Sequence, residues 1–444
     1  MVTLMSEGVL VERQRGHRAR LALSPAQVAA LDGQAHAARA LWNLLHQWWT
    51  MVGENRRVSL ADADAAIKQA RKDIDFLAVL PAQAAQAVLK TYFQAWRNCW
   101  DGRAEEPAFK SRFRTPMAVD VPQGRDLNTV RVHRRWGMVN IPKVGRVKFR
   151  WTKDLPVGKR ADAQNRISGA RLVKGALGWH IAFRVQTLET KPESHPGAVV
   201  GIDVGITVPL ALSDGHHQDH GRPCRTKDGT ADRDKWLNPH EQATLLHLER
   251  RAAQRKAHRT PGERTSRRLH RTYDRIRRLR ARATRRHRDW QHKTTTALAQ
   301  RYGTVVVEAL DITNMTRSAR GTVAEPGTNV AQKAGLNRAI GQEAWGRTVT
   351  LLEYKLADRG GTLVRVPAPG TSQRCSECGF TDPGNRRGQA VFVCGGPDCG
   401  FEDNADHNAA RNLVHLYRTG HALVPAAGRA VVRRARRVKP ATEK

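Results

Sequence analysis

The stretch GIDVGI, residues 201–206, follows the apolar run Ala198–Val200 and decides the fold of the second half of the chain. The run predicts a buried β-strand, and Asp203 stands inside it. A carboxylate among apolar neighbours is costly unless a partner holds it, and a bound metal ion is the strongest partner available. The alternative is an aspartate that caps a turn, because Gly201 and Gly205 flank it.

Two further acids share this pattern. Glu308 ends the apolar run TVVVE, and Asp406 lies in DNADHNAARNL at the expected start of a helix. Taken singly, Glu308 could pair with an arginine, and Asp406 or the neighbouring Asp403 could be a plain N-cap. Hydrolysis of a phosphodiester by two metal ions about 3.5–4 Å apart needs carboxylates that converge from different elements. Together with Asp203, in so basic a chain, these acids predict a site for Mg²⁺, which prefers oxygen ligands.

The composition indicates several domains and a polyanionic partner. A chain of 444 residues is too long for one ordinary core. Its 76 lysines and arginines against 41 acids give a net charge of +35, which favours nucleic acid. No apolar run approaches the roughly 18 residues of a membrane span, and MVTLMSEGVLVERQRG at the start has no signal-peptide core. We therefore expect a cytoplasmic protein without a membrane partner.

The cysteines indicate a metal site. Four of the six share two short turns, CSECG and CGGPDCG: Cys375, Cys378, Cys394 and Cys399. This spacing predicts one zinc ion held by four thiolates, and a closed site of this kind is structural. A disulfide pair is the alternative, but the spacing and the absence of a secretion signal count against it. Cys99 and Cys224 stand alone and are interpreted as incidental.

Strand-like and helical stretches alternate along the chain. Residues 8–23 and 101–190 contain extended runs, whereas 25–45 and 80–100 have helical spacing. After a linker at 191–197, residues 206–213 are expected to pair with the GIDVGI strand. Residues 335–361 read as one helix stopped by paired glycines, and TLVRVP after it reads as a strand.

A long helical hairpin is predicted over residues 240–302, broken at 260–262. Residues 250–293 contain 18 lysines and arginines and only three acids. A solvated helix face usually mixes both charges, so this stretch favours contact with phosphates.

Several of the eleven tryptophans lie in the first predicted helices: Trp42, Trp48, Trp49, Trp96 and Trp100. They could stack on unpaired bases. The helical spacing favours core positions for Trp42 and Trp96.

These motifs together resemble TnpB, the transposon-encoded (OrfB-type) RNA-guided DNA nuclease, and its relatives the miniature type V CRISPR effectors, which are Cas12-like. The resemblance runs through most of the chain, from LSPAQVAALDGQAHAARALWN (23–43) and EPAFKSR (106–112) through GIDVGI, VVVEALDITNM and GLNRAI. It is most specific at LLEYK, TSQRCSECG and NADHNAARNL.

The resemblance implies a multidomain α/β fold. Its parts are a RuvC-like (RNase H-like) nuclease domain with an inserted helical hairpin and a zinc ribbon, and an N-terminal wedge β-barrel with an inserted helical recognition domain. The expected boundaries are 1–23 and 104–190 for the wedge, 24–103 for the recognition helices, 191–197 for the linker, 198–370 for the nuclease domain with its basic insertion at 240–300, 371–402 for the zinc ribbon that contacts target nucleic acid, 403–417 for the C-terminal nuclease helix and 418–444 for a basic disordered tail.

The resemblance also implies an activity. Asp203, Glu308 and Asp406 match the catalytic triad that holds two Mg²⁺ ions, and the four clustered cysteines would hold one structural Zn²⁺. The expected partners are a guide RNA, derived from a transposon end or a CRISPR array, and double-stranded target DNA beside a short motif. Base pairing with the guide would supply specificity. The protein would act in the prokaryotic cytoplasm, at the nucleoid.

Some points stay open at this level. The second cysteine pair is separated by four residues where the family has two, and Asp406 is preferred to Asp403 only by the DxNAAxN pattern. A guide-dependent repressor that never cuts is a rival, although the intact acids count against it. A transposase or a transposase accessory protein is another. Monomer and dimer, and transposon-borne and CRISPR origin, are not distinguished.

Overall fold

The computed structural model describes residues 10–52, 58–112, 115–220, 236–260, 262–322 and 325–423. The chain divides into two compact units, with the division after Thr190. Each unit is described by itself. The lone Cys224 and most of the expected basic tail lie outside the described residues. Within the described ranges, no helix is both long enough and apolar enough to cross a membrane.

The first unit contains a seven-stranded antiparallel sheet in the order β2-β6-β7-β1-β5-β4-β3. Its strands are β1 (Leu10–Ala22), β2 (Ala118–Val121), β3 (Val130–His133), β4 (Trp136–Ile141), β5 (Gly145–Arg150), β6 (Arg166–Gly175) and β7 (Gly178–Thr190). Alternate residues of β4 and β5 are buried, as the two-residue period of a strand requires. The strand order is linear, with β2 and β3 at its ends.

Helices α1 (Pro25–Val52), α2 (Leu60–Asp73), α3 (Asp75–Ala78) and α4 (Ala82–Trp100) are inserted between β1 and β2. Trp42 of α1 is buried against Tyr92 of α4, with ring centroids 5.1 Å apart. The core position predicted for Trp42 is confirmed. Trp96 is only partly buried and packs against the edge of the same core.

The second unit is built on a five-stranded sheet in the order β10-β9-β8-β11-β12. Its strands are β8 (Val199–Asp203), β9 (Leu210–Leu212), β10 (His217–Gln218), β11 (Thr304–Glu308) and β12 (Thr362–Val366). β8, β11 and β12 are parallel, and β9 and β10 are added antiparallel. The apolar interiors of β8 and β11 are buried, because helices cover both faces of the sheet.

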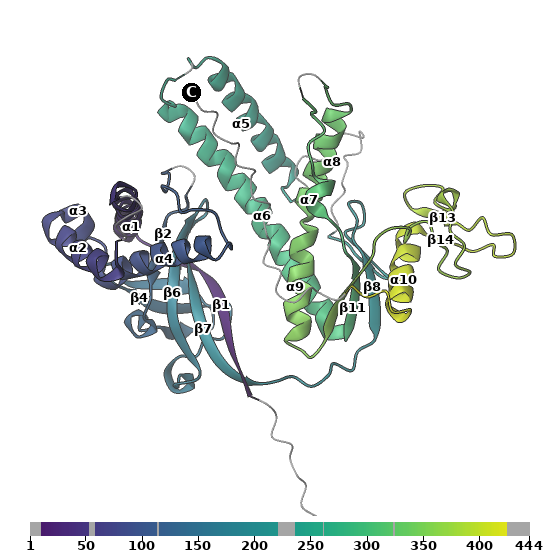
Figure 1. The fold of residues 1–444 in the computed structure, drawn as a ribbon, viewed down its shortest axis with the longest axis horizontal. Helices are drawn as coiled ribbons and strands as arrows, with labels where there is room; N and C mark the ends of the chain where they lie inside the picture. Colours follow the sequence, from purple (N-terminus) through teal and green to yellow (C-terminus); the bar gives the residue numbers. More distant parts are fainter. Residues whose placement is uncertain are drawn as a thin grey trace, which may run out of the picture. The chain divides into compact units, whose positions relative to one another are not determined.

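One face of this sheet packs on α6 (Arg267–Arg301) and α9 (Trp345–Ala357), and the other packs on α10 (Ala405–Arg418) (Figure 1). Helix α6 also pairs with α5 (Pro239–Ala257) in the predicted hairpin, through a core of its own. A cysteine-bearing hairpin, β13 (Val391–Val393) and β14 (Glu402–Asn404), precedes α10. The other helices are α7 (Ile312–Met315) and α8 (Val330–Glu343).

The single helix predicted over residues 335–361 is wrong in one respect. The structure has two helices, α8 and α9, which meet at Ala344, whose φ of 50° and ψ of 48° are left-handed. This conformation costs an L-residue about 1–2 kcal/mol, so neighbouring contacts must hold it. Gln291 of α6, fully buried, supplies them through its Nε2, which donates to the Ala344 carbonyl at 3.4 Å and to Thr348 Oγ1 at 2.9 Å.

Candidate active site

The three acids singled out from the sequence lie at the ends of their elements. Asp203 is the last residue of β8, not an interior one as the sequence suggested, and Glu308 is the last residue of β11. Ile202 lies opposite Val307 in the parallel pair of β8 and β11. Asp203 and Glu308 are the next residues of these two strands, so they lie side by side at the same edge of the sheet. Asp406 lies in the first turn of α10, where a helix dipole tolerates negative charge.

Gly201 explains how α10 reaches this edge. A Cβ atom built on Gly201 would lie 2.0 Å from the Ala410 carbonyl oxygen, so only glycine allows α10 to lie this close to β8. The fully buried Ala410 lies one helical turn beyond Asp406 on α10. The glycine that opens GIDVGI therefore brings the Asp406 helix against the strand that carries Asp203.

The three carboxylates form one electrostatic cluster. Burial raises the pKa of Asp203, and the charges of Glu308 and Asp406 raise it further, to about 7. Burial also raises the pKa of Glu308 and that of Asp406. Buried carboxylates that repel one another are stabilised by a proton or by a bound cation, and hard oxygen donors are the ligands that Mg²⁺ and similar ions prefer.

Arg386 supplies positive charge at this cluster, and the sequence analysis missed it. Its Nη2 lies 3.2 Å from Asp406 Oδ1, and its charge lowers the pKa of Asp203, Glu308 and Asp406. Arg386 belongs to the segment between the two cysteine pairs, and its guanidinium also donates to the carbonyls of Gly388 and Gln389 within that segment. Among 76 lysines and arginines, nothing local in the sequence distinguishes it.

A buried hydrogen-bond chain orients Glu308. Thr371 Oγ1 donates to Glu308 Oε1 at 2.6 Å, which lowers the pKa of that carboxyl against the effect of burial. Asn412 of α10, fully buried, donates through Nδ2 to the carbonyls of Thr371 at 2.9 Å and Arg374 at 2.6 Å. The start of the cysteine-bearing segment is thereby fixed to α10 and to the carboxylate cluster at once.

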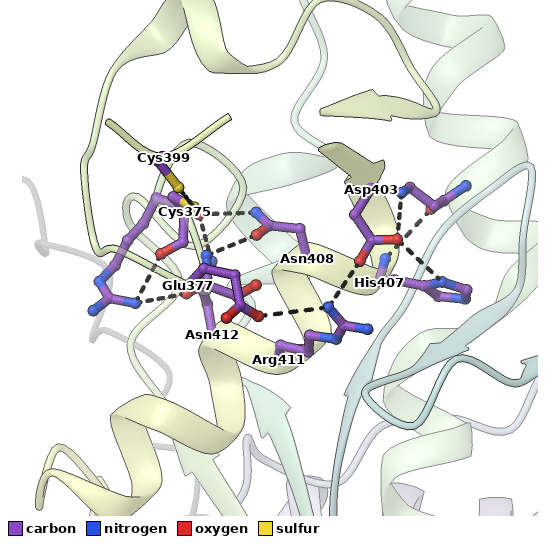
Figure 2. Close-up of polar contacts among 11 residues, drawn as sticks. Cys375, Glu377, Cys399, Asp403, His407, Asn408, Arg411 and Asn412 are labelled. Carbon is purple, nitrogen blue, oxygen red and sulfur yellow. Dashed lines mark hydrogen bonds and ion pairs between the residues drawn. The ribbon is translucent and has the colours of Figure 1, made fainter. Parts of the chain in front are cut away.

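Asp403 does not belong to this cluster. Its Oδ2 lies 3.2 Å from Arg411 Nη1, and its Oδ1 lies 4.0 Å from His407 Nδ1 (Figure 2). Asn404 caps α10 by accepting from the backbone N–H of Asp406. The carboxylate next to Asp203 and Glu308 is that of Asp406, as the sequence pattern had suggested.

The four clustered cysteines lie together. Their Sγ atoms are all within 4.8 Å of one another. The Cys378–Cys394 pair is separated by 3.5 Å and the Cys375–Cys399 pair by 3.8 Å, far beyond the roughly 2.05 Å of a disulfide bond. All four are free thiols. The arrangement is that of a metal site with four sulfur ligands, and the alternative of a disulfide pair is excluded among them.

Asn408 connects this thiol cluster to α10. It is fully buried, its Oδ1 accepts from the Ser376 backbone N–H at 2.9 Å, and its Nδ2 donates to the Arg374 carbonyl at 2.8 Å (Figure 2). Ser376 lies between two of the cysteines, so the metal site is held beside the helix that carries Asp406.

Cys99 is half-buried in α4, in the other unit.

The basic hairpin presents its charge to solvent. The buried face of α6 carries Leu269, Ile276 and Leu279, whereas Arg271, Arg275 and Arg278 are exposed. In the first unit, Trp49, Trp96 and Trp100 stack on one another, with ring centroids 5.0 Å apart for the first pair and 6.0 Å apart for the second.

The fold and the site define the class: an α/β protein with a buried cluster of three carboxylates and a four-cysteine metal-binding motif. Two family models match the chain, "Probable transposase" at residues 180–319 and "Cas12f1-like, TNB domain" at residues 345–413. The chain is 30% identical over 344 residues, 78% of its length, to the protein named "Putative RNA-guided DNA endonuclease InsQ" from Escherichia coli, of which the match covers 76%. The chain belongs to the family of InsQ, the TnpB family, and the resemblance drawn from its motifs is confirmed.

Two other similarities accompany this match. A protein named "Putative RNA-guided DNA endonuclease" from Streptomyces pristinaespiralis is 27% identical over 384 residues. The match covers 85% of this chain and 81% of that relative. A solved complex of Cas12f1 with single guide RNA and target DNA is similar over 88% of this chain and 83% of that one, at 15% identity and a TM-score of 0.47.

Proposed function

We propose that this protein is an RNA-guided DNA endonuclease that hydrolyses phosphodiester bonds with divalent metal ions held by Asp203, Glu308 and Asp406. One observation carries the proposal. Three acids more than 90 residues apart in the sequence meet at one buried point, where burial first, and then the charges of Glu308 and Asp406, raise the pKa of Asp203 to about 7. Buried acids with strongly raised pKa values are concentrated at functional sites, where a cation or a reaction makes use of them.

The fold supports a RuvC-like (RNase H-like) nuclease domain. In such a domain the first strand lies in the middle of a five-stranded sheet, with the order 3-2-1-4-5, and β10-β9-β8-β11-β12 is that order. We assign the seven-stranded sheet to the wedge and the helices inserted between β1 and β2 to the recognition domain. We assign the cysteine segment to the zinc ribbon, which its short hairpin and its four clustered thiols support.

The carboxylate cluster suits two Mg²⁺ ions, because its donors are buried hard oxygens. When bound, such ions lower the pKa of a coordinated water and stabilise charge on the attacking and leaving oxygens. The side chains of this chain have their own roles. Thr371 orients Glu308 through its hydrogen bond, and Arg386 offers a guanidinium beside the carboxylates where negative charge develops on a phosphate.

The four thiols suit one structural Zn²⁺, because soft sulfur donors in a closed tetrahedral set favour it. The net charge of +35 suits a guide RNA and a target DNA duplex bound through their backbones. InsQ is described as an RNA-guided DNA endonuclease, and we carry that description over to this chain. The protein would meet its target at the nucleoid, in the prokaryotic cytoplasm.

The test is cleavage by the purified complex of protein and copurifying guide RNA on a matched DNA duplex with Mg²⁺. The wild-type complex cuts the duplex, whereas Asp203→Ala and Glu308→Gln bind guide and target but do not cut. Binding without cleavage by the wild-type complex would instead identify a guided repressor. Cleavage at the wild-type rate by either variant would refute the assignment of the triad.

A further inference from the structure

The second unit contains a hollow at the edge of its sheet, which we call the edge hollow. Its volume is about 470 Å³, within the range of roughly 300–1,000 Å³ that is typical of small-ligand sites. The end of β11, the start of α7 and the first turns of α9 surround it (elements labelled in Figure 1). Glu308 of the triad also lines it, so the hollow is continuous with the carboxylate cluster.

The edge hollow and the triad lie on opposite sides of the same strand ends. Ile202 and Val307, each one residue before an acid of the triad, pack in the core beneath α9. Because side chains alternate along a strand, Asp203 and Glu308 point to the other face, toward α10. Val204 comes after Asp203 and packs with the α9 core again. A DNA strand that holds one phosphate at the triad can therefore place its neighbouring nucleotide over the edge, at the hollow.

Trp345 fixes one wall of the hollow to the strand that carries Asp203. It is the first residue of α9 and is buried, and its Nε1 donates to the Gly205 carbonyl at 3.3 Å. Gly205 lies two residues beyond Asp203 in GIDVGI. The fold therefore holds the hollow at a set distance from the triad.

The lining of the hollow suits an uncharged group. Four of its side chains are apolar and only half-buried: Val204, Leu310, Ile312 and Val349. They offer apolar surface that a ligand can cover. Glu308 and the exposed Asp311 also line the hollow and repel a phosphate. Arg365 lines it too, but its Nη2 lies 3.2 Å from Glu353 Oε2. The hollow therefore favours the base of a nucleotide and leaves the phosphate outside.

Gly346 keeps the edge hollow open. It lies in the first turn of α9, where glycine is a weaker helix former than alanine. Its φ is not left-handed, and a Cβ built on it would meet the end of the Ile312 side chain at 3.4 Å, an ordinary contact. Neither the backbone nor close packing requires glycine here, whereas a larger side chain would fill the hollow. Gly335 of α8 has open surroundings and does not line the hollow, so it provides a matched control.

We propose that the edge hollow receives the base of the DNA nucleotide next to the scissile phosphate, and that Gly346 is a positioning residue for cleavage. The inference rests on the proposed nuclease function and deepens it. A base held in the hollow keeps the strand from sliding, so that one phosphate, and not its neighbours, lies at the triad. The consequence is a defined position of the cut.

The test is single-turnover cleavage of duplexes with one abasic nucleotide in the strand that does not pair with the guide. The cut is first mapped on the intact duplex, and the abasic nucleotide is then placed on either side of the cut or, as a control, a few nucleotides away. In the wild type and in Gly335→Leu, a missing base on one side of the cut should slow cleavage about tenfold or more, because misplacement of the reacting group is that costly. Gly346→Leu should cut the intact duplex with a similar loss, and the missing base should slow it by less than about twofold further, because the contact is already gone.

A crosslink tests the same contact without cleavage. Asp203→Ala, bound to guide and to a duplex with an iodo-substituted deoxyuridine beside the cut position, is irradiated, and the labelled peptides are mapped. We expect the label in residues 307–312 or 345–350. Label elsewhere only would overturn the inference, and this result does not depend on the folding of Gly346→Leu. Thermal unfolding verifies that both leucine variants are folded.

Two cleavage results would overturn the inference and leave the nuclease proposal standing. One is wild-type cleavage that a missing base on either side of the cut does not slow. The other is a missing base that slows Gly346→Leu as much as it slows the wild type. If the wild type does not cut the intact duplex at all, the nuclease proposal fails, and this inference fails with it.

Discussion

The α-carbon of Gly201 on β8 lies so close to Ala410 on α10 that a Cβ there would stand 2.0 Å from the Ala410 carbonyl oxygen. Ordinary Cβ contacts are never so short, so a side chain must push strand and helix apart. The two elements carry Asp203 and Asp406, respectively, and their separation sets that of the two carboxylates.

Gly201→Ala should therefore damage stability and the site together. We expect a loss of about 1–3 kcal/mol in the free energy of unfolding, the usual cost of overpacking, or more because backbone is involved. Denaturant unfolding and the cleavage rate measure the two effects. Gly335→Ala, in an open part of α8, is the matched control and should be neutral or slightly stabilising. Full activity in Gly201→Ala would show that the close approach is not needed.

Arg386 gives a second prediction. Its guanidinium lies beside Asp406 and offsets the repulsion within the cluster. Arg386→Ala should lower the cleavage rate by about 10²–10³-fold at saturating Mg²⁺, as the loss of one charge-stabilising donor does, while target binding is kept. The neighbouring Arg387, which is exposed, is the control for the loss of one positive charge. Equal losses in Arg386→Ala and Arg387→Ala would assign the effect to general nucleic-acid affinity.

Thr371→Val tests the chain that orients Glu308. The substitution keeps the shape of the side chain and removes the hydroxyl that donates to Glu308 Oε1. Because that hydrogen bond lowers the pKa of Glu308, its loss should raise the pKa and weaken divalent-metal binding. When the cleavage rate is titrated with Mn²⁺, the variant should reach its half-maximal rate at a higher Mn²⁺ concentration than the wild type. Saturating Mn²⁺ should restore part of the wild-type rate. An unchanged titration curve would remove Thr371 from the site.

Asp203 predicts how stability depends on pH without metal. Its pKa in the folded protein is about 7, above the ordinary value of 3.8, so its protonated form is favoured by folding. This contribution, on the order of a few kcal/mol, is fully present below pH 3.8 and is lost as the pH rises through about 7. Measured in chelator, the Tm of the wild type should fall from pH 6 to pH 8 by more than that of Asp203→Asn. Equal falls in the two proteins would contradict the raised pKa.

The cysteine cluster predicts a structural metal. Cys375→Ser should lose one bound metal ion per chain, expose residues 371–404 to protease and reduce cleavage, because Arg386 and Thr371 both belong to that segment. Cys99→Ser lies in the other unit and should change none of these properties. Elemental analysis and limited proteolysis are the measurements. A normal metal content in Cys375→Ser would reject the four-thiol site.

The sequence allowed the acids and cysteines to be predicted because their signals are local. An apolar strand that ends in an acid, such as TVVVE, and a pair of closely spaced cysteines each identify an element and a chemical role. Arg386 and Thr371 have no such local signal. Their contacts with Asp406 and Glu308 arise only when the cysteine segment folds back on α10 through Asn412.

The break between α8 and α9 was missed for a similar reason. The stretch around Ala344 has good helical spacing, and no proline or paired glycine interrupts it. Its left-handed backbone is held by Gln291, which lies 53 residues earlier in the sequence. Local propensity therefore predicts a continuous helix, and a tertiary contact overrides it.

The central claim is that Asp203, Glu308 and Asp406 share divalent ions. Crystals of the protein with guide RNA and target DNA, soaked in Mn²⁺ and measured at the manganese absorption edge, test it most directly. We expect two anomalous peaks about 3.5–4 Å apart among these three carboxylates, and none there in Asp203→Ala. Manganese bound elsewhere, with the three carboxylates unoccupied in a complex that cuts DNA, would contradict the account.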